Sequence, residues 1–521
     1  MKRTDGTSRW LALTDEISFA IGSTLVEQAK GIMAEQTSSR RELRIVIIGA
    51  GMAGILSAIK LREAGYNDFI IYEKGDSVGG TWRENTYPGL ACDVPAHVYT
   101  YSFEPNPTWS HVFAPGTEIR QYFENVARKY HVTEKVCFGE EVASCEFLDG
   151  RWSIRTGSGR TDRADVVIAA TGVLHHPNIP YFKGIETFHG AHFHSARWDH
   201  SVPLDGQRVG VVGTGSTAVQ ITSALVGRVA KFKLFQRTAQ WVSKGENPAY
   251  STADIAAFSQ DPQRLQAVRA ELEGSFSGFS SAVIDAESPM MKKIEAACLA
   301  NLETVVDPVL REKLRPNYRA ACKRLVFSPD FYEAIQHPNA ELVVSGIDHV
   351  EPAGVRTKDG VLHGLDVLVL ATGFRADRFI RPTVVRGRGG VDLDEVWEDH
   401  PVAYLSIAVP DFPNFFMLDG PNGPVGNFSL IRIAEQQIHY IMQLLDRLRS
   451  GQCREISPLH SAAVAFEKAR IEAAKKSIWA TGCKSWYLDK HGVPASWPWS
   501  QSRFDEEMAA PKFEAYELKA E

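Results

Sequence analysis

The sequence predicts an α/β chain in which two parallel-sheet domains are interrupted by a helical insertion. Two glycine-rich turns, beginning at Gly49 and Gly213, each follow a short apolar run and precede a helical pattern. A strand, a glycine turn and a helix in that order start a dinucleotide-binding unit. Between Gly245 and Leu314 the β-branched runs stop, and helix-start signals take their place. We therefore expect two Rossmann-like dinucleotide-binding domains with a helical insertion.

Six short apolar runs are expected to form buried strands of the two sheets. They are rich in β-branched residues and alternate with helical patterns, as in a doubly wound sheet that is covered on both faces. These runs are Arg44–Ile48, Phe69–Glu73, Asp165–Ala170, Arg208–Val212, Phe232–Arg237 and Asp366–Ala371. Near the C-terminus, the longer periodic segments Leu430–Ser450 and Ser461–Trp479 are expected to be helices.

The glycine turns and the insertion divide the chain into expected parts. They are an N-terminal helical extension at 1–40, the domain of the first turn at 41–177 and 385–521, the domain of the second turn at 178–244 and 320–384, and the helical insertion at 245–319. The apolar residues of the extension fall on one stripe, so it either packs on the body or binds a partner.

Composition excludes several classes of protein. The 521 residues are 44% hydrophobic and 23% charged, which is typical of a globular chain and not of a disordered one. The net charge of −6 is small and the basic residues are scattered, so we expect neither nucleic acid nor an anionic membrane as a partner. No apolar run approaches the ~20 residues of a membrane span.

The seven cysteines are scattered along the chain and show no C-x-x-C spacing. This pattern indicates neither a metal site nor a redox pair. The number of cysteines is odd, and disulfides are rare in reducing compartments, so the pattern fits a reducing cytosol. We therefore expect a cytoplasmic protein without a bound metal.

The first turn places glycines at Gly49, Gly51 and Gly54, directly after one strand and before a helix. The glycines permit a tight turn and a close approach of the backbone to a pyrophosphate, which the helix N-terminus faces. The next strand ends on Glu73. Because a carboxylate at that position accepts hydrogen bonds from free ribose hydroxyls, this unit suits FAD.

The second turn differs from the first in the residue that follows it. Its candidate binding residues are Gly213, Thr214, Gly215, Ser216, Thr217 and Ala218, with alanine in the third glycine position. At the same offset from the turn as Glu73, this unit carries Arg237. A guanidinium pairs with a 2′-phosphate, so the second site suits NADPH, and Thr238 can add a hydroxyl to that phosphate. Two such cofactors imply hydride transfer from nicotinamide to flavin.

Three further strings point to a family. Residues 188–199 read FHGAHFHSARWD and match the pattern F-x-G-x3-H-x3-W-(P/D) at every fixed position. Residues 79–93 read GGTWRENTYPGLACD and follow a second pattern, which ends on Asp93. Lys323-Arg324 stands directly after the insertion. With these strings the chain resembles the type I Baeyer–Villiger monooxygenases from Arg44 to about Pro498.

The resemblance implies roles for several residues. The loop that contains Thr81 would wrap the FAD, with Trp82 and Tyr99 as flavin contacts. Arg324 would be the catalytic arginine over the flavin, and Asp93 would hold its guanidinium.

On the NADPH side, the resemblance implies that Lys323 also reaches the 2′-phosphate and that Trp486 contacts the nicotinamide cofactor. The residues that follow, Tyr487–His491, depart from the cyclohexanone-type continuation and look more like the branch that acts on aryl, large-ring or steroid ketones. The insertion and the loop Gly420–Asn427 are expected to bound the substrate pocket. The oligomeric state is left open.

The implied reaction uses NADPH and O2 to convert a ketone to an ester or lactone through a flavin peroxide. Arg324 would stabilise the negative charge that develops on the adduct. The alternative is a flavin monooxygenase that oxygenates nitrogen or sulfur, and a redox-sensing binding protein is a further one. Asp93 and the Lys323-Arg324 pair favour the Baeyer–Villiger reaction over both.

Overall fold

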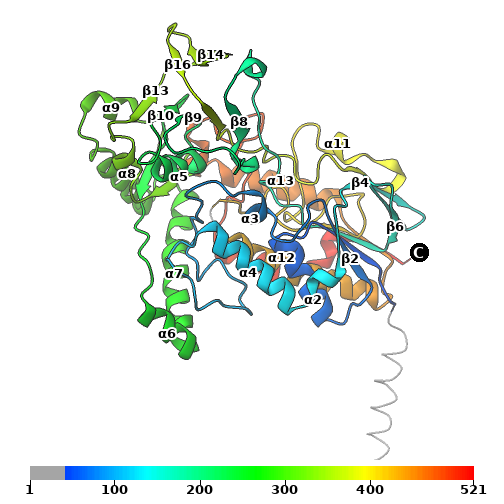
Figure 1. Ribbon diagram of the computed structural model, residues 1–521. Helices are drawn as coiled ribbons and strands as arrows, with labels where there is room; N and C mark the ends of the chain where they lie inside the picture. Colours follow the sequence, from blue (N-terminus) through cyan, green and yellow to red (C-terminus); the bar gives the residue numbers. More distant parts are fainter. Residues whose placement is uncertain (1–40, 427, 521) are drawn as a thin grey trace, which may run out of the picture.

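The computed structural model describes residues 41–426 and 428–520 (Figure 1). The helical extension expected at 1–40 lies outside these residues. The first sheet has five parallel strands in the order β19-β7-β1-β2-β3. Its strands are β1 (Ile45–Ile48), β2 (Phe69–Glu73), β3 (Val136–Phe138), β7 (Val166–Ala169) and β19 (Phe415–Met417).

The second sheet also has five parallel strands, in the order β13-β10-β9-β17-β8. Its strands are β8 (Ala191–His194), β9 (Arg208–Val212), β10 (Lys231–Phe235), β13 (Ala340–Val343) and β17 (Val367–Leu370). All six expected strands are therefore present, and their ends differ from the expected ones by two residues at most. The predicted α/β fold class with two Rossmann-like sheets is confirmed.

Smaller sheets complete the β structure. They are β18-β4-β5-β6, from β4 (Val142–Leu148), β5 (Arg151–Thr156), β6 (Thr161–Ala164) and β18 (Val384–Arg386); β14-β15-β16, from β14 (Ile347–Glu351), β15 (Gly354–Thr357) and β16 (Leu362–Gly364); β11-β12, from β11 (Val242–Lys244) and β12 (Val326–Ser328); and β20-β21, from β20 (Glu455–Pro458) and β21 (Tyr516–Lys519).

Helices cover the sheets and form the insertion. Those outside the insertion are α2 (Met52–Glu63), α3 (Thr81–Glu84), α4 (Gly116–Lys129), α5 (Ser216–Leu225), α10 (Phe331–Ala334), α11 (Leu393–Val396), α12 (Leu430–Arg449), α13 (His460–Ala474) and α14 (Gln501–Ala509). Short 3-10 helices lie at Val132–Lys135, Ile185–Thr187, Ser195–Arg197, Arg388–Gly390, Ile478–Thr481 and Phe513–Ala515. None of these helices, nor those of the insertion, is long and apolar enough to cross a membrane, as far as the chain is described.

The first sheet is buried on both faces, which explains the unbroken apolar run of β1. Side chains alternate between the faces of a strand. Ile45 and Ile47 join the core that contains α2, α4 and α12, whereas Val46 and Ile48 join a core with Trp152 of the β18-β4-β5-β6 sheet. A strand that is covered in this way has no solvent-facing position, so a continuous apolar run is expected.

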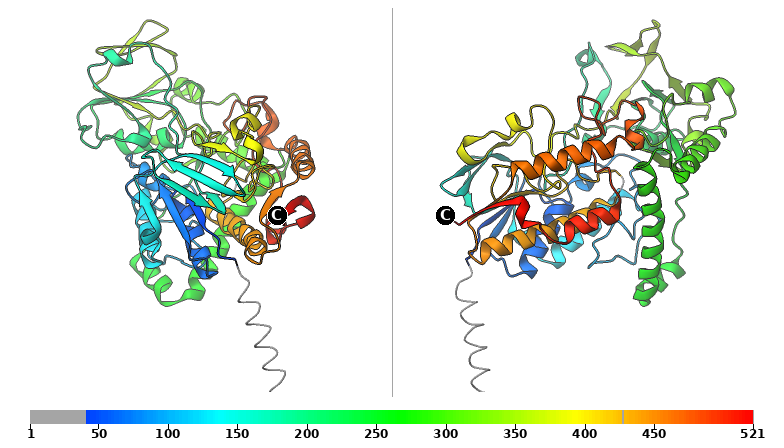
Figure 2. Two further views of the ribbon diagram at one scale, coloured as in Figure 1. Left: turned by 90° about the vertical axis from the view of Figure 1, so that its right-hand side faces the viewer. Right: turned by 180° about the vertical axis from the view of Figure 1, so that it is seen from behind.

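The expected helical insertion is present as α6 (Thr252–Gln260), α7 (Pro262–Val283), α8 (Pro289–Leu302) and α9 (Pro308–Lys313). Asp261 caps α7 as its sequence indicates, because its side chain accepts hydrogen bonds from the first backbone N–H groups of the helix. In Figures 1 and 2, α7 (green) runs along the first-sheet domain from α6 at one end toward the second-sheet domain. Leu272 and Phe276 of α7 pack against the core of the first sheet.

One disulfide is present that the spacing of the cysteines does not indicate. Cys322 and Cys483 form a disulfide between segments that lie 161 residues apart in sequence. Spacing along the chain detects only neighbours such as C-x-x-C, and the fold alone brings these two together. Among the described residues the other five cysteines are free.

Candidate active site

A continuous cavity of about 990 Å³ lies between the two large sheets. The carboxyl ends of β1 and β9 both open onto it, and each is followed there by its glycine turn. Ligands of open parallel sheets bind at this edge. Of the residues predicted to contact cofactors or substrate, all but Gly54 and Ala218 line the cavity.

The first turn shows why glycine is needed at two of its positions. Gly49 has a φ of +101°, and a Cβ there would lie 2.6 Å from the carbonyl oxygen of Ala170. A Cβ on Gly54 would lie 1.9 Å from the carbonyl oxygen of Gly49, so this glycine serves helix packing and not ligand contact. Gly51 precedes α2, whose N-terminus has no side-chain cap. Uncapped N–H groups at a helix start bind phosphate oxygens.

The second turn repeats this construction. Gly213 has a φ of +128°, and a Cβ there would meet the carbonyl oxygen of Ala371 at 2.2 Å. Gly215 precedes the uncapped N-terminus of α5, and a Cβ on it would have nothing within 4 Å. Ala218 is fully buried in the second-sheet core. The two turns therefore fit two pyrophosphates, and each leaves its middle glycine open to the cavity.

Glu73 lies in the cavity wall but is already engaged by the protein. Its carboxylate accepts hydrogen bonds from the backbone N–H groups of Ala50 (2.8 Å) and Gly75 (2.7 Å), and it pairs with Arg83 at 3.0 Å. These contacts fix the carboxylate at the end of β2. Nearby, Trp82 donates from Nε1 to the Tyr99 hydroxyl at 3.2 Å.

Arg237 and Lys323 form the charged end of the second site. Both line the cavity, and neither makes an ion pair with a carboxylate among the described residues. Burial lowers the pKa of Lys323, and the nearby positive charge of Arg237 lowers it further. The ammonium lies 4.5 Å from the centroid of the Tyr318 ring. Two neighbouring cations without an acidic partner fit a multiply charged anion.

The hydroxyls of the second turn have defined neighbours. Thr214 donates from Oγ1 to the carbonyl oxygen of Thr238 at 2.8 Å. This hydrogen bond joins the glycine turn to the loop that follows β10. Thr217 lies 3.4 Å from the Tyr87 hydroxyl, which itself donates to Gln220. Ser216 and Thr238 also line the cavity.

Arg324 and Asp93 meet as expected. The Oδ2 atom of Asp93 accepts from Nε of Arg324 at 3.1 Å and from Nη2 at 2.5 Å. Burial alone lowers the pKa of Arg324, but the Asp93 carboxylate and the Tyr487 hydroxyl outweigh it and raise this pKa above its ordinary value. Arg324 is therefore a permanent cation in the cavity wall. Trp486 lies at the rim, with 43% of its surface exposed.

Three features of this site were not expected from the sequence. Tyr487 lines the same small hollow as Arg324, although its sequence position indicated only a family branch. Asp419, at the end of β19, lines the cavity, and burial raises its pKa to about 7. The Cys322–Cys483 disulfide joins two segments of the site, because Cys322 shortly precedes Arg324 and Cys483 shortly precedes Trp486. Of these three features, only Asp419 could have been noticed in the sequence, because it is a carboxylate directly after a short apolar run.

Two Rossmann sheets that face one cavity, each with an open glycine turn and an uncapped helix, define a class of oxidoreductases that use two dinucleotides. The pyridine nucleotide-disulphide oxidoreductase family model matches residues 46–257. An uncharacterized monooxygenase of Mycobacterium tuberculosis is 46% identical over 91% of this chain and 96% of its own length. A Baeyer-Villiger monooxygenase of Streptomyces coelicolor is 36% identical over 93% of this chain and 94% of its own.

A solved structure agrees with these relatives. The cyclohexanone monooxygenase from Rhodococcus bound to NADP+ superposes with a TM-score of 0.83 at 28% identity, and covers 92% of this chain and 99% of its own. The chain belongs to the Baeyer–Villiger monooxygenases. It is an FAD-containing, NADPH-dependent monooxygenase that oxidises ketones.

Proposed function

We propose that Arg324 and Asp93 are the catalytic pair of this enzyme, and that it converts apolar ketones to esters or lactones. The observation that carries the proposal is the Arg324–Asp93 ion pair in the wall of a cavity that two dinucleotide turns share. Bound FAD, once reduced by NADPH, supplies the activated oxygen. The protein has to hold the ketone, exclude water and stabilise the negative charge that forms on the former carbonyl oxygen.

Arg324 is suited to that stabilising role. Its guanidinium keeps its proton at any working pH, since its pKa is raised. Asp93 uses one oxygen to hold two of the five guanidinium N–H groups, so the remaining donors stay available for the reacting oxygen. A fixed donor of this kind stabilises a developing oxyanion without reorganising at the moment of reaction.

A small apolar hollow beside Arg324 indicates which elements surround the ketone. Phe276, Phe279 and Val283 of α7 line it together with Phe327 and Trp479. The insertion thus forms part of the wall next to the catalytic arginine, which supports the expectation that it bounds the substrate pocket. The proposed preference for aryl, large-ring or steroid ketones follows the resemblance of Tyr487–His491 to that branch of the family.

The cofactors are assigned to the two halves of the cavity. We propose that Gly49, Gly51 and Glu73 hold FAD with Thr81, Trp82 and Tyr99. The other half, with the residues of the second turn, Arg237, Thr238, Lys323 and Trp486, holds NADPH. The first-sheet domain would comprise 41–177 and 385–521, and the second-sheet domain 178–244 and 320–384.

The proposed location is the cytoplasm. It rests on the five free cysteines, of which Cys92, Cys145, Cys298 and Cys453 are buried. The Cys322–Cys483 disulfide runs against it, because such bonds are rare in reducing compartments. Alkylating the thiols during cell lysis and then mapping the modified cysteines tests both points.

Replacing the arginine tests the catalytic assignment. Arg324→Ala should keep its FAD and lose ester formation by about a hundredfold or more, which is the usual effect of removing one oxyanion donor. The half-buried Arg315, which pairs with Glu303 and Glu312 outside the cavity, provides the matched variant Arg315→Ala, which should retain ester formation. The assay is ester or lactone formed from a panel of aryl, large-ring and cyclic ketones, with a thioether alongside. Normal ester yield from Arg324→Ala would contradict the assignment, and thioether oxidation without any ester would favour the sulfur-oxygenating alternative.

A further inference from the structure

Arg324 is held firmly on one side of its guanidinium. Its two side-chain hydrogen bonds, from Nε and from Nη2, both go to the single oxygen Oδ2 of Asp93. A guanidinium carries five N–H donors in a plane, so two bonds to one acceptor still permit the plane to tilt about that oxygen. A second contact on another edge would fix the plane.

Tyr487 is placed to supply such a contact, because it lines the same small hollow as Arg324 and Asp93. Its side chain is buried, with 4% of its surface exposed, and the nearness of its hydroxyl raises the pKa of Arg324. The hydroxyl also lies against the backbone of Gly426, where an added Cβ would be only 2.1 Å from it. Asp93, Arg324, Gly426 and Tyr487 surround the same small hollow. The Gly426 backbone therefore limits the space around the Tyr487 hydroxyl.

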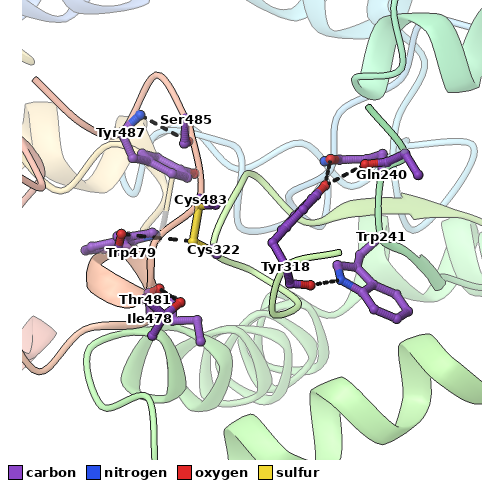
Figure 3. Close-up of a disulfide and its surroundings, with 11 residues drawn as sticks. Gln240, Trp241, Tyr318, Cys322, Ile478, Trp479, Thr481, Cys483, Ser485 and Tyr487 are labelled. Atoms are coloured by element: carbon purple, nitrogen blue, oxygen red, sulfur yellow. Dashed lines mark hydrogen bonds between the residues drawn. A yellow bond between two sulfur atoms is a disulfide. The ribbon is translucent and has the colours of Figure 1, made fainter. Parts of the chain in front are cut away.

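The position of Tyr487 is itself fixed by its neighbours (Figure 3). Its backbone N–H donates to Oγ of Ser485 at 3.2 Å, and its carbonyl oxygen accepts from the N–H of Ala495 at 2.7 Å. Its ring packs against Trp486, with ring centroids 4.2 Å apart, and against Trp479, with centroids 5.3 Å apart. A tyrosine held at both backbone groups and on its ring offers its hydroxyl in one place.

The disulfide joins the two segments that carry this contact. Cys322 directly precedes Lys323-Arg324, and Cys483 lies four positions before Tyr487. Figure 3 shows the bond between the loop after the insertion and the C-terminal segment, with Trp479 beside it and the Tyr487 side chain nearby. Both segments also share one buried core, which includes Cys322, Cys483 and Tyr487. The covalent bond thus limits how far the tyrosine segment can move from the arginine loop.

From these contacts we propose that Tyr487 is a positioning residue for Arg324, and that the Cys322–Cys483 disulfide holds the Tyr487 segment against the arginine loop. The inference rests on the proposed function, because it assigns Tyr487 a part in keeping the catalytic cation aimed. The tyrosine acts through Arg324 and does not itself touch the reacting atoms. A guanidinium held by Asp93 and Tyr487 is preorganised for a developing oxyanion, and this is where fixed donors have their effect.

The disulfide makes this arrangement sensitive to dithiols. A dithiol reductant would transfer two electrons and two protons to the S–S bond, which breaks to give the Cys322 and Cys483 thiols. The dithiol itself is oxidised to a disulfide, so the exchange balances. The Tyr487 segment would then be held by hydrogen bonds and packing alone.

The first test removes only the hydroxyl. Tyr487→Phe keeps the ring that packs against Trp486 and Trp479, and should fold and bind FAD. We expect about a tenfold fall in ester formed per NADPH consumed, with the KM for NADPH unchanged, because NADPH oxidation no longer leads efficiently to ester. The matched control is Tyr440→Phe, which removes a buried hydroxyl that pairs with Tyr516 at 3.0 Å away from the cavity. It should keep the wild-type ester yield per NADPH.

The outcomes separate this inference from the proposed function. Wild-type ester yield per NADPH in Tyr487→Phe overturns the positioning role, while the Baeyer–Villiger assignment stands. A loss that is equal in Tyr440→Phe also overturns it, since any buried hydroxyl would then suffice. No ester from the wild-type enzyme with any ketone of the panel overturns the proposed function, and the inference with it.

The second test removes the covalent bond. The double variant Cys322→Ser with Cys483→Ser should lose part of the ester yield per NADPH, and Tyr487→Phe should lower that yield less in this background than in the wild type. Treating the wild-type holoenzyme with a dithiol should reproduce the loss, and the double variant should not respond. A non-reduced digest of the wild type should contain the two cysteine peptides joined. Free thiols at both positions, or full additivity of the variants, would overturn the role of the disulfide.

Discussion

At the residue scale, two charged side chains are proposed to decide which nicotinamide nucleotide the second site accepts. Arg237 and Lys323 both line the cavity and have no carboxylate partner among the described residues. Each would gain a charge-assisted contact from a 2′-phosphate, which NADH lacks. We therefore expect the preference for NADPH to depend on these two side chains and not on the fold.

Removing the guanidinium of Arg237 should therefore erase most of that preference. In Arg237→Ala, we expect the ratio of kcat/KM for NADPH to kcat/KM for NADH to fall about ten- to hundredfold, which corresponds to the ~1.5–3 kcal/mol of a hydrogen bond to a charged group. The activity with NADH should change little. The control is Arg228→Ala, since Arg228 is exposed and pairs with Asp205. An unchanged ratio in Arg237→Ala would mean that the 2′-phosphate binds elsewhere.

Residues of this kind differ in how well the sequence reveals them. Arg237 was found because it stands at a fixed offset from Gly213, within one local unit of strand, turn and helix. Tyr487 and the Cys322–Cys483 bond have no such signal, because each contact joins segments that only the folded chain brings together. The contact of Asp93 with Arg324 spans a similar distance in sequence, and it was expected only through the family resemblance.

At the scale of elements, the strands and helices of the two large sheets were predictable because their apolar runs reflect burial on both faces. The short edge strands were not predicted. β19 and β18 have three residues each, and β19 belongs to the first sheet although it lies far along the chain. Three residues carry too little periodicity to distinguish a strand from a buried loop.

The contact between the insertion and the first-sheet domain includes a buried histidine. His97 is only 2% exposed, and its ring lies 5.2 Å from the Tyr250 ring and 5.0 Å from the Phe258 ring of α6, centroid to centroid. Burial, and then the positive charge of Arg269, lower the pKa of His97 to about 4. In the unfolded chain, His97 has its ordinary pKa of 6.5. Between pH 6.5 and about pH 4 the imidazole is therefore protonated in the unfolded chain and neutral in the folded enzyme.

Stability should accordingly fall as the pH drops from 6.5 towards 4. In that window the unfolded state binds more protons than the folded state, so the free energy of unfolding rises with pH, and His97 accounts for up to about 3 kcal/mol of this change. His97→Phe keeps a ring in the aromatic cluster but cannot titrate, so its stability should depend less on pH. Denaturant midpoints of the holoenzyme at several pH values measure this. The exposed His131 gives the control His131→Gln, which should follow the wild type. Parallel curves for His97→Phe and wild type would contradict the prediction.

At the scale of the whole molecule, the first-sheet domain is assembled from both ends of the described chain. Its glycine turn lies between β1 and the first residues of α2, yet β19 adds the outer strand beside β7 and α12 packs against α2. Asp419, Phe428 and Leu430 from the C-terminal part also line the cavity. The glycine-turn motif is therefore local in sequence, whereas the proposed FAD site is not.

A chain cut between the exposed residues Glu398 and Asp399 should show this division. The fragment 1–398 contains Gly49, Gly51 and Glu73, but it lacks β19 and α12 and would expose the core that they cover, so it should purify without flavin absorbance. Co-expressing 399–521 should restore the absorbance, because the cut lies in an exposed loop and the strand and helix can pair as in the intact chain. Flavin bound to 1–398 alone would show that the glycine turn and its helix suffice. Failure of the co-expressed pair, with both fragments present in soluble form, would show that the covalent connection itself is required.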